Sequence, residues 1–194
     1  MKEIFNQIWN LALPYQDKRG DKGHAEITLK YAIRLLKSEK GNKDIVIPAI
    51  ILHDTGWSQL SEIEGRVIFD ADATKEAKLS VRYKHQDAGV KISRKILNSI
   101  DYPTSMVDEV LEIVSQHDTR EGFFSKNEGL VRDSDKLWRF SKIGFNADLI
   151  RGKISFHNLY SKLINRVETP NFLYSYTARE IAYDELKIRA SEFQ

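Results

Sequence analysis

The most constraining stretch of the sequence is residues 45–57, IVIPAIILHDTGW, in which an apolar run ends abruptly in His53 and Asp54. Almost every residue before this pair is apolar, so the segment should be buried on all sides. Pro48 is tolerated near the start of a helix and argues against a central strand. An imidazole and a carboxylate placed together in a core are costly unless they share a partner, and a divalent cation satisfies both. The sequence therefore predicts that His53 and Asp54 are metal ligands.

Length and composition narrow the class of protein. With 194 residues, the chain is expected to form one domain over residues 1–194. Cysteine is absent, which excludes thiolate ligands, leaves nitrogen and oxygen donors for any metal, and fits a cytoplasmic location. The net charge of +2 comes without a basic cluster, so a nucleic-acid polymer is not expected as a partner. No apolar run approaches the roughly 18 residues of a membrane span, so no membrane association is expected.

The apolar spacing is mostly three and four, and glycine and proline are few, which predicts a mainly helical chain. Residues 58–74 are expected to be a loop with at most a short helix, because Ser61 and Glu64 have capping-box spacing. Thr177 and Glu180 have the same spacing and are expected to open the last helix. The predicted helices cover residues 1–13, 24–40, 45–54, 75–100, 104–117, 130–138, 156–167 and 177–193.

Six polar groups fall on the apolar faces or at the ends of these helices. His85, for example, lies between Val81 and Ala88 on one face, and Asp135 shares a face with Val131. A single inward histidine is more often a hydrogen-bonded core residue than a ligand. Six such groups would need separate partners in one small core, whereas a shared metal site satisfies them together. The six are His24, His53, Asp54, His85, His117 and Asp135.

The order of these residues resembles that of the HD-domain superfamily of metal-dependent phosphohydrolases, over about residues 23–140. The motifs that carry the resemblance are GHAEITLKYA, AIILHDTGW, KHQDAG, IVSQHD and LVRDSDKLWR. The resemblance implies an all-α helical bundle with the metal site between its core helices. The C-terminal helices of residues 156–193 are expected to pack on this metal-binding core. Asp135, rather than Asp133, matches the final aspartate of the family, because it precedes Lys136.

The resemblance also implies a site for two divalent ions. His24, His53, Asp54 and Asp135 would bind the first ion, and Asp54 would bridge to a second ion held by His85 and His117. Iron and manganese are the expected metals, and magnesium, nickel, zinc and cobalt also accept this ligand set. Two ions would lower the pKa of a shared water and orient the resulting hydroxide for attack on phosphorus.

One position departs from the pattern: many relatives have lysine after the glycine that follows the His-Asp pair, and this chain has Trp57. If that lysine contacts a phosphate in those relatives, another cation must do so here or the substrate differs. Each candidate cation could instead lie on a solvent-exposed helix face and have no such role. The candidates near ligand positions are Lys84, Arg120, Lys136 and Arg139. Residues that flank ligands and could orient imidazoles are Gln86, Asp87 and Asp118. His157 lies outside every motif and is expected to be structural or exposed.

The expected function is hydrolysis of a phosphate ester or anhydride in a small molecule, with a nucleotide as the first choice. His53 and Asp54 would act through the ions, and Lys136 and Arg120 would contact the substrate. One alternative is a diiron oxygenase of the same fold that acts on a small hydroxylated compound; the short interval between His117 and Asp135 favours the hydrolase. A second alternative is a nucleotide-binding regulatory module, against which the complete ligand set argues. A homodimer is one option for the oligomeric state.

Overall fold

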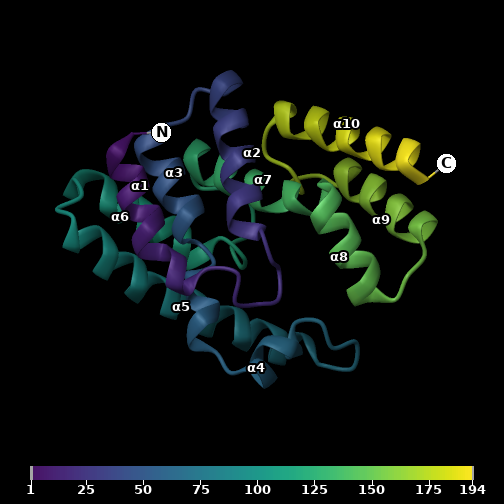
Figure 1. Cartoon of the computed structure of the whole chain (residues 1–194), viewed down its shortest axis with the longest axis horizontal. Coiled ribbons are helices and arrows are strands. Elements are labelled where there is room, and N and C mark those ends of the chain that lie inside the picture. The colour runs from purple at the N-terminus through teal and green to yellow at the C-terminus, as the bar shows by residue number, and fades with distance from the viewer. Residues whose placement is uncertain (1, 194) are drawn as a thin grey trace.

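The structure is a computed structural model that describes residues 2–193, and within them the chain forms ten α-helices, three short 3-10 helices and no strand. The prediction of an all-α fold is confirmed. None of the described helices is long and apolar enough to cross a membrane. The elements, labelled in Figure 1, are α1 (Glu3–Ala12), η1 (Leu13–Tyr15), α2 (His24–Ser38), α3 (Lys43–Leu52), η2 (Thr55–Gln59), α4 (Glu62–Val67), α5 (Lys75–Ser99), α6 (Thr104–Gln116), α7 (Lys126–Leu137), η3 (Trp138–Phe140), α8 (Lys142–Gly152), α9 (Phe156–Glu168) and α10 (Tyr176–Phe193).

Helix α3 is the centre of the core. Every residue from Ile45 to Leu52 is buried, as the sequence predicted, because α1, α2, α6 and α7 pack around the helix. Pro48 lies inside α3 and has no N–H to give to the carbonyl of Asp44. The Tyr102 hydroxyl donates to that carbonyl at 2.6 Å, so the group stays satisfied. The apolar run can therefore remain helical through the proline up to His53.

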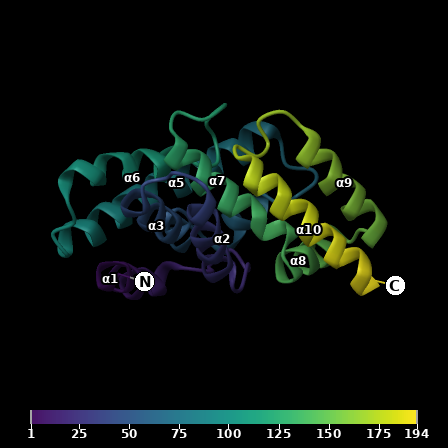
Figure 2. The same cartoon turned by 90° about the horizontal axis from the view of Figure 1, so that it is seen from above.

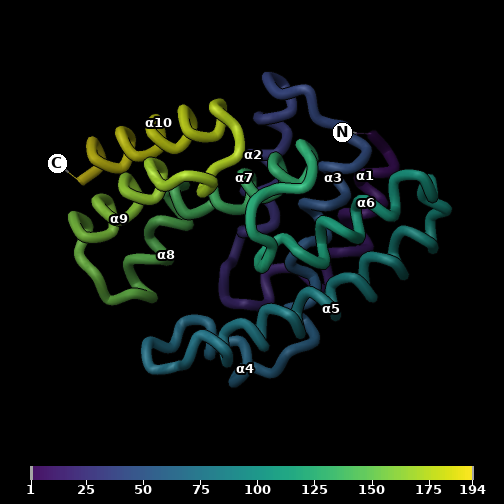
Figure 3. The backbone as a smooth tube through the Cα atoms, turned by 180° about the vertical axis from the view of Figure 1, so that it is seen from behind, coloured from purple at the N-terminus to yellow at the C-terminus, as the bar shows by residue number. Residues whose placement is uncertain are grey.

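The segment after α3 packs tightly on α5. Helices α5 and α6 lie side by side (Figure 3). The short helix η2 also packs closely against α5. Gly56 lies so close that a Cβ built there would be 1.8 Å from the His85 carbonyl oxygen. The predicted capping box is present in α4, where Ser61 accepts from the Glu64 N–H and Glu64 accepts from the Ser61 N–H.

Helices α8, α9 and α10 form a group on the side of the molecule away from α1 (Figures 1 and 2). Its apolar contacts come from Phe145, Leu159, Leu163, Ile181 and Leu186, all of which are buried.

Two sequence expectations in this half of the chain were wrong, and one helix was not predicted. Helix α7 begins at Lys126 rather than Leu130, because Ser125 caps it by accepting from the Glu128 N–H. Helix α8 was not predicted. Helix α10 is capped by Ser175, whose hydroxyl accepts from the Ala178 N–H at 3.1 Å, and Thr177 instead lies within the helix and donates to Glu39.

Candidate metal centre

The six predicted ligands come together from five helices. His24 is the first residue of α2, His53 and Asp54 directly follow α3, and His117 directly follows α6. His85 lies in α5 and Asp135 in α7. The ligand atoms form two groups, within each of which all atoms lie less than 4.8 Å apart. The first group is His24, His53, Asp54 and Asp135, and the second is Asp54, His85 and His117.

Backbone carbonyls orient two of the imidazoles. The Nδ1 atom of His53 lies 2.8 Å from the Ile50 carbonyl oxygen, and that of His117 lies 2.9 Å from the Val114 carbonyl oxygen. A carbonyl oxygen only accepts, so Nδ1 carries the hydrogen in both rings. Each Nε2 is then free to present its lone pair toward the cluster, as metal binding requires.

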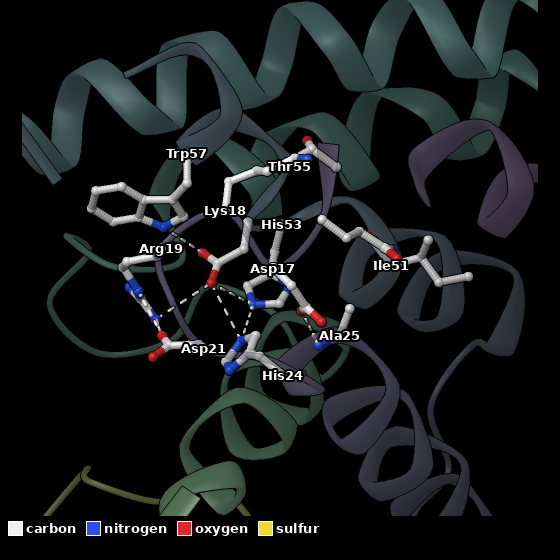
Figure 4. A pocket seen from close by; sticks show the side chains of 12 residues that line it. Asp17, Lys18, Arg19, Asp21, His24, Ala25, Ile51, His53, Thr55 and Trp57 are labelled. Carbon is white, nitrogen blue, oxygen red and sulfur yellow. Dashed lines mark hydrogen bonds and ion pairs between the residues drawn. The ribbon is translucent and has the colours of Figure 1, made fainter. Parts of the chain in front are cut away.

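The start of α2 is fixed by the loop before it. Gly23, with φ of +82°, takes the left-handed conformation that favours glycine. Asp17 accepts from the Gly23 N–H at 2.7 Å and from the Ala25 N–H at 3.1 Å, which satisfies two donors at the helix N-terminus. His24 is thereby held at the first position of the helix with its ring directed to His53 (Figure 4).

The distances in the first group fit a shared ion. His24 Nε2 lies 3.2 Å from His53 Nε2, 3.3 Å from Asp54 Oδ2 and 3.2 Å from Asp135 Oδ1. His53 Nε2 lies slightly farther from both carboxylates, at 3.6 Å from each oxygen. Two ligand atoms that bind one ion at about 2.1 Å lie roughly 3.0–3.4 Å apart in octahedral or tetrahedral geometry. The second group is similar, with 3.3 Å between the Nε2 atoms of His85 and His117.

Asp54 faces both groups with different oxygens. Its Oδ2 atom lies 3.3 Å from His24 Nε2 and 3.6 Å from His53 Nε2. Its Oδ1 atom lies 3.4 Å from His117 Nε2 and 3.8 Å from His85 Nε2. This is the arrangement in which one carboxylate bridges two cations.

The donor set itself suits cations. His53 and His117 direct acceptor lone pairs at the Nε2 atoms of neighbouring imidazoles, and two lone pairs that face each other in a core repel unless a proton or a metal lies between them. The residues present therefore fit divalent ions with nitrogen and oxygen ligands. The four histidine side chains are at most 4 % exposed, whereas Asp54 is 18 % and Asp135 is 25 % exposed, so the cluster opens to solvent on its carboxylate side.

Electrostatics differ between the two groups. Burial opposes charge on His53, yet the neighbouring carboxylates of Asp54 and Asp135 raise its pKa to about 9. Burial and the nearby ring of His117 lower the pKa of His85 to about 3. Burial also opposes ionisation of Asp54, but His53 and Arg19 hold its pKa well below the usual range. When no metal is bound, His53 therefore holds a second proton more readily than His85 does.

Trp57, the residue that departs from the family pattern, holds Asp54 in place. Its indole N–H donates to Asp54 Oδ1 at 3.0 Å, and its ring lies 4.1 Å from the His85 ring. The Arg19 guanidinium lies over the same indole, 4.9 Å from the ring centre (Figure 4). Trp57 thus links the Asp54 carboxylate, the His85 imidazole and the Arg19 guanidinium.

Arg19 was missed by the sequence analysis. Its Nη2 atom lies 3.6 Å from Asp54 Oδ2, and its Nε atom donates to Asp21 at 2.8 Å. Despite burial, Asp54 and Asp21 raise the pKa of Arg19 above its usual value. The sequence feature that could have indicated a role for Arg19 is its position in the loop, between two aspartates and five residues before His24. That loop gives no helical period from which the direction of a side chain could be read.

Two cations proposed as substrate contacts have other partners. Lys136 donates to the Phe172 carbonyl and lies over the rings of Phe123 and Phe172, and burial lowers its pKa to about 8. Arg120 pairs with Glu112 and with the fully buried Glu128. Both side chains thus have structural contacts that the sequence did not indicate.

Two further cationic candidates pair with carboxylates, and one flanking carboxylate lies near the cluster. Lys84 pairs with Glu64 at 3.0 Å, and Arg139 pairs with Asp148 at 2.7 Å. Asp118 Oδ2 lies 3.8 Å from His85 Nε2, which places a further carboxylate beside the second group.

Two of the flanking residues and the fifth histidine are not directed at the cluster. Gln86 is buried and accepts from Thr119, whereas Asp87 is exposed. His157 is exposed and packs beside Phe156 and Phe193, as expected for a histidine outside the site.

Comparison with known proteins gives one match. The family model described as HD domain matches residues 22–139, which is more than half of the chain and includes all six ligand residues. No curated protein and no solved structure matches the chain. The matched segment begins two residues before His24 and ends four residues after Asp135.

Proposed function

The chain belongs to the HD-domain family, and from that premise we propose that it hydrolyses a phosphate ester or anhydride in a small molecule, with a nucleotide as the preferred class. HD domains are generally metal-dependent hydrolases of the phosphohydrolase type. The observation that carries the proposal is that the two oxygens of Asp54 face the two histidine groups, since one carboxylate placed in this way could serve two adjacent cations.

The residues have separate tasks in this proposal. His24, His53, Asp135 and Asp54 Oδ2 would hold one ion, and His85, His117 and Asp54 Oδ1 would hold the other. Bound divalent ions would acidify water at neutral pH and neutralise charge on the phosphoryl group. Trp57 keeps the Asp54 carboxylate in its bridging orientation by donating to Oδ1.

Arg19 is the best-placed contact for the phosphoryl group. Its guanidinium lies beside Asp54 on the solvent-open side of the cluster, and Asp21 and Trp57 fix its position. The planar fork of arginine matches two oxygens of a phosphate, and a preordered fork loses little entropy on binding. Arg19 would therefore supply a cationic contact for the phosphoryl group in a chain that has Trp57 where many relatives have lysine.

A cavity beside Arg19 supports a substrate larger than phosphate. It has a volume of about 490 Å³ and is lined by Trp57, Lys18, Arg66 and Phe69 as well as Arg19. Small-molecule sites are typically about 300–1,000 Å³, with apolar and aromatic walls and a few polar groups. Lys18 suits an additional phosphate, whereas Arg66 is paired with Glu62, which also lines the cavity. The exposed Phe69 ring offers a face for a planar base.

The test is turnover of a nucleotide panel by metal-loaded protein in a sealed anaerobic vessel, with oxygen-18 water as the label source. We expect release of phosphate or of a phosphorylated product, label from water, and activity with manganese in place of iron, because no redox change is needed. Arg19→Gln should raise KM by about tenfold or more, whereas Lys187→Gln, an exposed charge on α10, should change it less than twofold. Absence of turnover with every phosphorylated compound, together with oxygen-dependent consumption of a hydroxylated compound, would establish the oxygenase alternative.

A further inference from the structure

A second cavity lies between η3, α8 and α9, apart from the metal centre. It has a volume of about 140 Å³, which leaves room for several water molecules or for one hydrated oxyanion. Its cationic lining is Arg139 from η3, Arg151 from α8, and Lys162 and Arg166 from α9. Asp148 is the single carboxylate among the described residues that line the cavity, so the lining itself carries an excess of three positive charges.

The ion pairs leave part of this charge free. Arg139 and Arg151 share Asp148, at 2.7 Å and 3.5 Å. Arg151 also pairs with Asp21, which offsets one more charge from outside the cavity. Arg166 is half-buried, and among residues 2–193 it makes no ion pair with a carboxylate.

The surroundings of Arg166 disfavour its charge in the absence of a ligand. Burial and repulsion from Arg139 lower the pKa of Arg166. The floor of the cavity is apolar, with Ile154, Leu159 and Leu163. Electrostatic attraction is stronger beside such a low-dielectric wall than in open solvent. An anion placed between the two arginines would remove their repulsion and supply the missing counter-charge.

We propose that this cavity, formed by Arg139, Arg151, Lys162 and Arg166, is a binding site for a phosphoryl group. Two or more guanidinium forks suit the several oxygens of a phosphate better than the two oxygens of a carboxylate. The site does not depend on metal or on hydrolysis, so it goes beyond the function proposed above.

A chain of side-chain contacts joins this cavity to the metal centre. Asp21 binds Arg151 on one side and Arg19 on the other, and Arg19 lies beside Asp54. Phe69 lines both this cavity and the cavity beside Arg19, and the Arg151 guanidinium lies 4.0 Å from its ring centre. The ligand is therefore either a second phosphoryl group of a substrate that extends from the metal centre or a separate phosphate.

The binding experiment is calorimetric titration of the metal-loaded full chain with inorganic phosphate at constant ionic strength. We expect two sites, of which one is weakened by Arg19→Gln and the other is weakened at least tenfold by Arg166→Gln. Lys187→Gln removes one positive charge elsewhere and should change neither affinity by more than twofold. Lys162→Gln, at an exposed position, provides a second test should Arg166→Gln fail to fold. A single phosphate site with the same affinity in the wild type, Lys162→Gln and Arg166→Gln overturns the proposal.

The source of the phosphoryl group is decided with whichever nucleotide is turned over. A larger KM increase in Arg166→Gln for polyphosphorylated than for monophosphorylated substrates assigns the site to the substrate. A rate change by free phosphate that is not competitive with substrate, and that is lost in Arg166→Gln, assigns it to a separate ion. The binding experiment needs no turnover, so the failure of hydrolysis and the failure of this site are distinguishable.

Discussion

Gly56→Ala should separate η2 from α5 and damage the second half of the metal centre. A Cβ at this position would lie 1.8 Å from the His85 carbonyl oxygen and 2.5 Å from the Gly89 nitrogen. Both atoms belong to the backbone, so no side chain can rotate away to make room. The helix must shift as a unit, and His85 would move with it away from Asp54.

The cost can be bounded from the geometry. Overpacking of a core typically costs about 1–3 kcal/mol, and a clash with backbone belongs at the upper end, so we expect about 3 kcal/mol. For a chain of this length each kcal/mol lowers Tm by about 2–4 °C, which gives a decrease of about 6–12 °C. Metal analysis should show weaker occupancy of the group formed by Asp54, His85 and His117.

Gly65→Ala is the matched control, because nothing lies within 4 Å of a Cβ built there and the residue is inside α4. It should stabilise the fold by about 0.4–1 kcal/mol through the lower entropy of the unfolded chain. Thermal unfolding of both variants, with and without a chelator, separates the loss of packing from the loss of metal. If Gly56→Ala unfolds within 1 °C of the wild type and keeps the full metal content, the close approach of η2 and α5 does not constrain the site.

Three further predictions concern the site and its surroundings. Asp54→Ala should release both ions and lower Tm, because the bridge is lost and its neighbours become unpaired buried groups, whereas His157→Ala should change neither; retention of either ion at wild-type affinity argues against bridging. Metal affinity should rise with pH up to about 9, because the proton on His53, with a pKa of about 9, must leave before the ion binds, and titration in two buffers should reveal its release; affinity that is constant between pH 6 and 8 contradicts this. Lys136→Met should leave KM unchanged and fold at least as stably as the wild type near pH 7. Burial lowers the pKa of Lys136 to about 8, so below pH 8 the folded wild type holds a charged, buried lysine at a cost in stability. The difference between the two proteins should shrink as pH rises from 8 toward 10.5, because the lysine of the folded protein is then neutral. An increase in KM would show instead that Lys136 contacts the substrate.

The central helix and the direction of the inward histidines could be predicted from the sequence because both follow from helical periodicity. Apolar residues on every side of α3 leave it no solvent-facing side, and His85 shares a face with Val81 regardless of tertiary detail. The capping box of α4 was likewise readable, since both of its hydrogen bonds join residues three apart. Local rules sufficed where local geometry fixes the outcome.

The features that escaped prediction depend on contacts distant in sequence. Helix α8 contains Gly144, which looks like a helix breaker, but a Cβ there would lie 2.0 Å from the Trp138 carbonyl oxygen. Its exposed Ile143 and Ile150 also obscure the apolar stripe. The cap of α10 is Ser175 rather than Thr177, because the buried Asp133 carboxylate accepts from the N–H and hydroxyl of Ser175. Neither a tight helix crossing nor a buried carboxylate that anchors another helix leaves a short-range pattern.

The division of ligands along the chain has a consequence for biosynthesis. The second group, Asp54, His85 and His117, is complete once the chain has been synthesised past His117, directly after α6. The first group still lacks Asp135, which comes only with α7. A chain that emerges from the ribosome N-terminus first therefore exposes a full set of ligands for one ion before the other set is complete. We expect nascent chains stalled after His117 but before Asp135 to bind an ion in the second group first. Full occupancy of the first group in such chains would contradict this order.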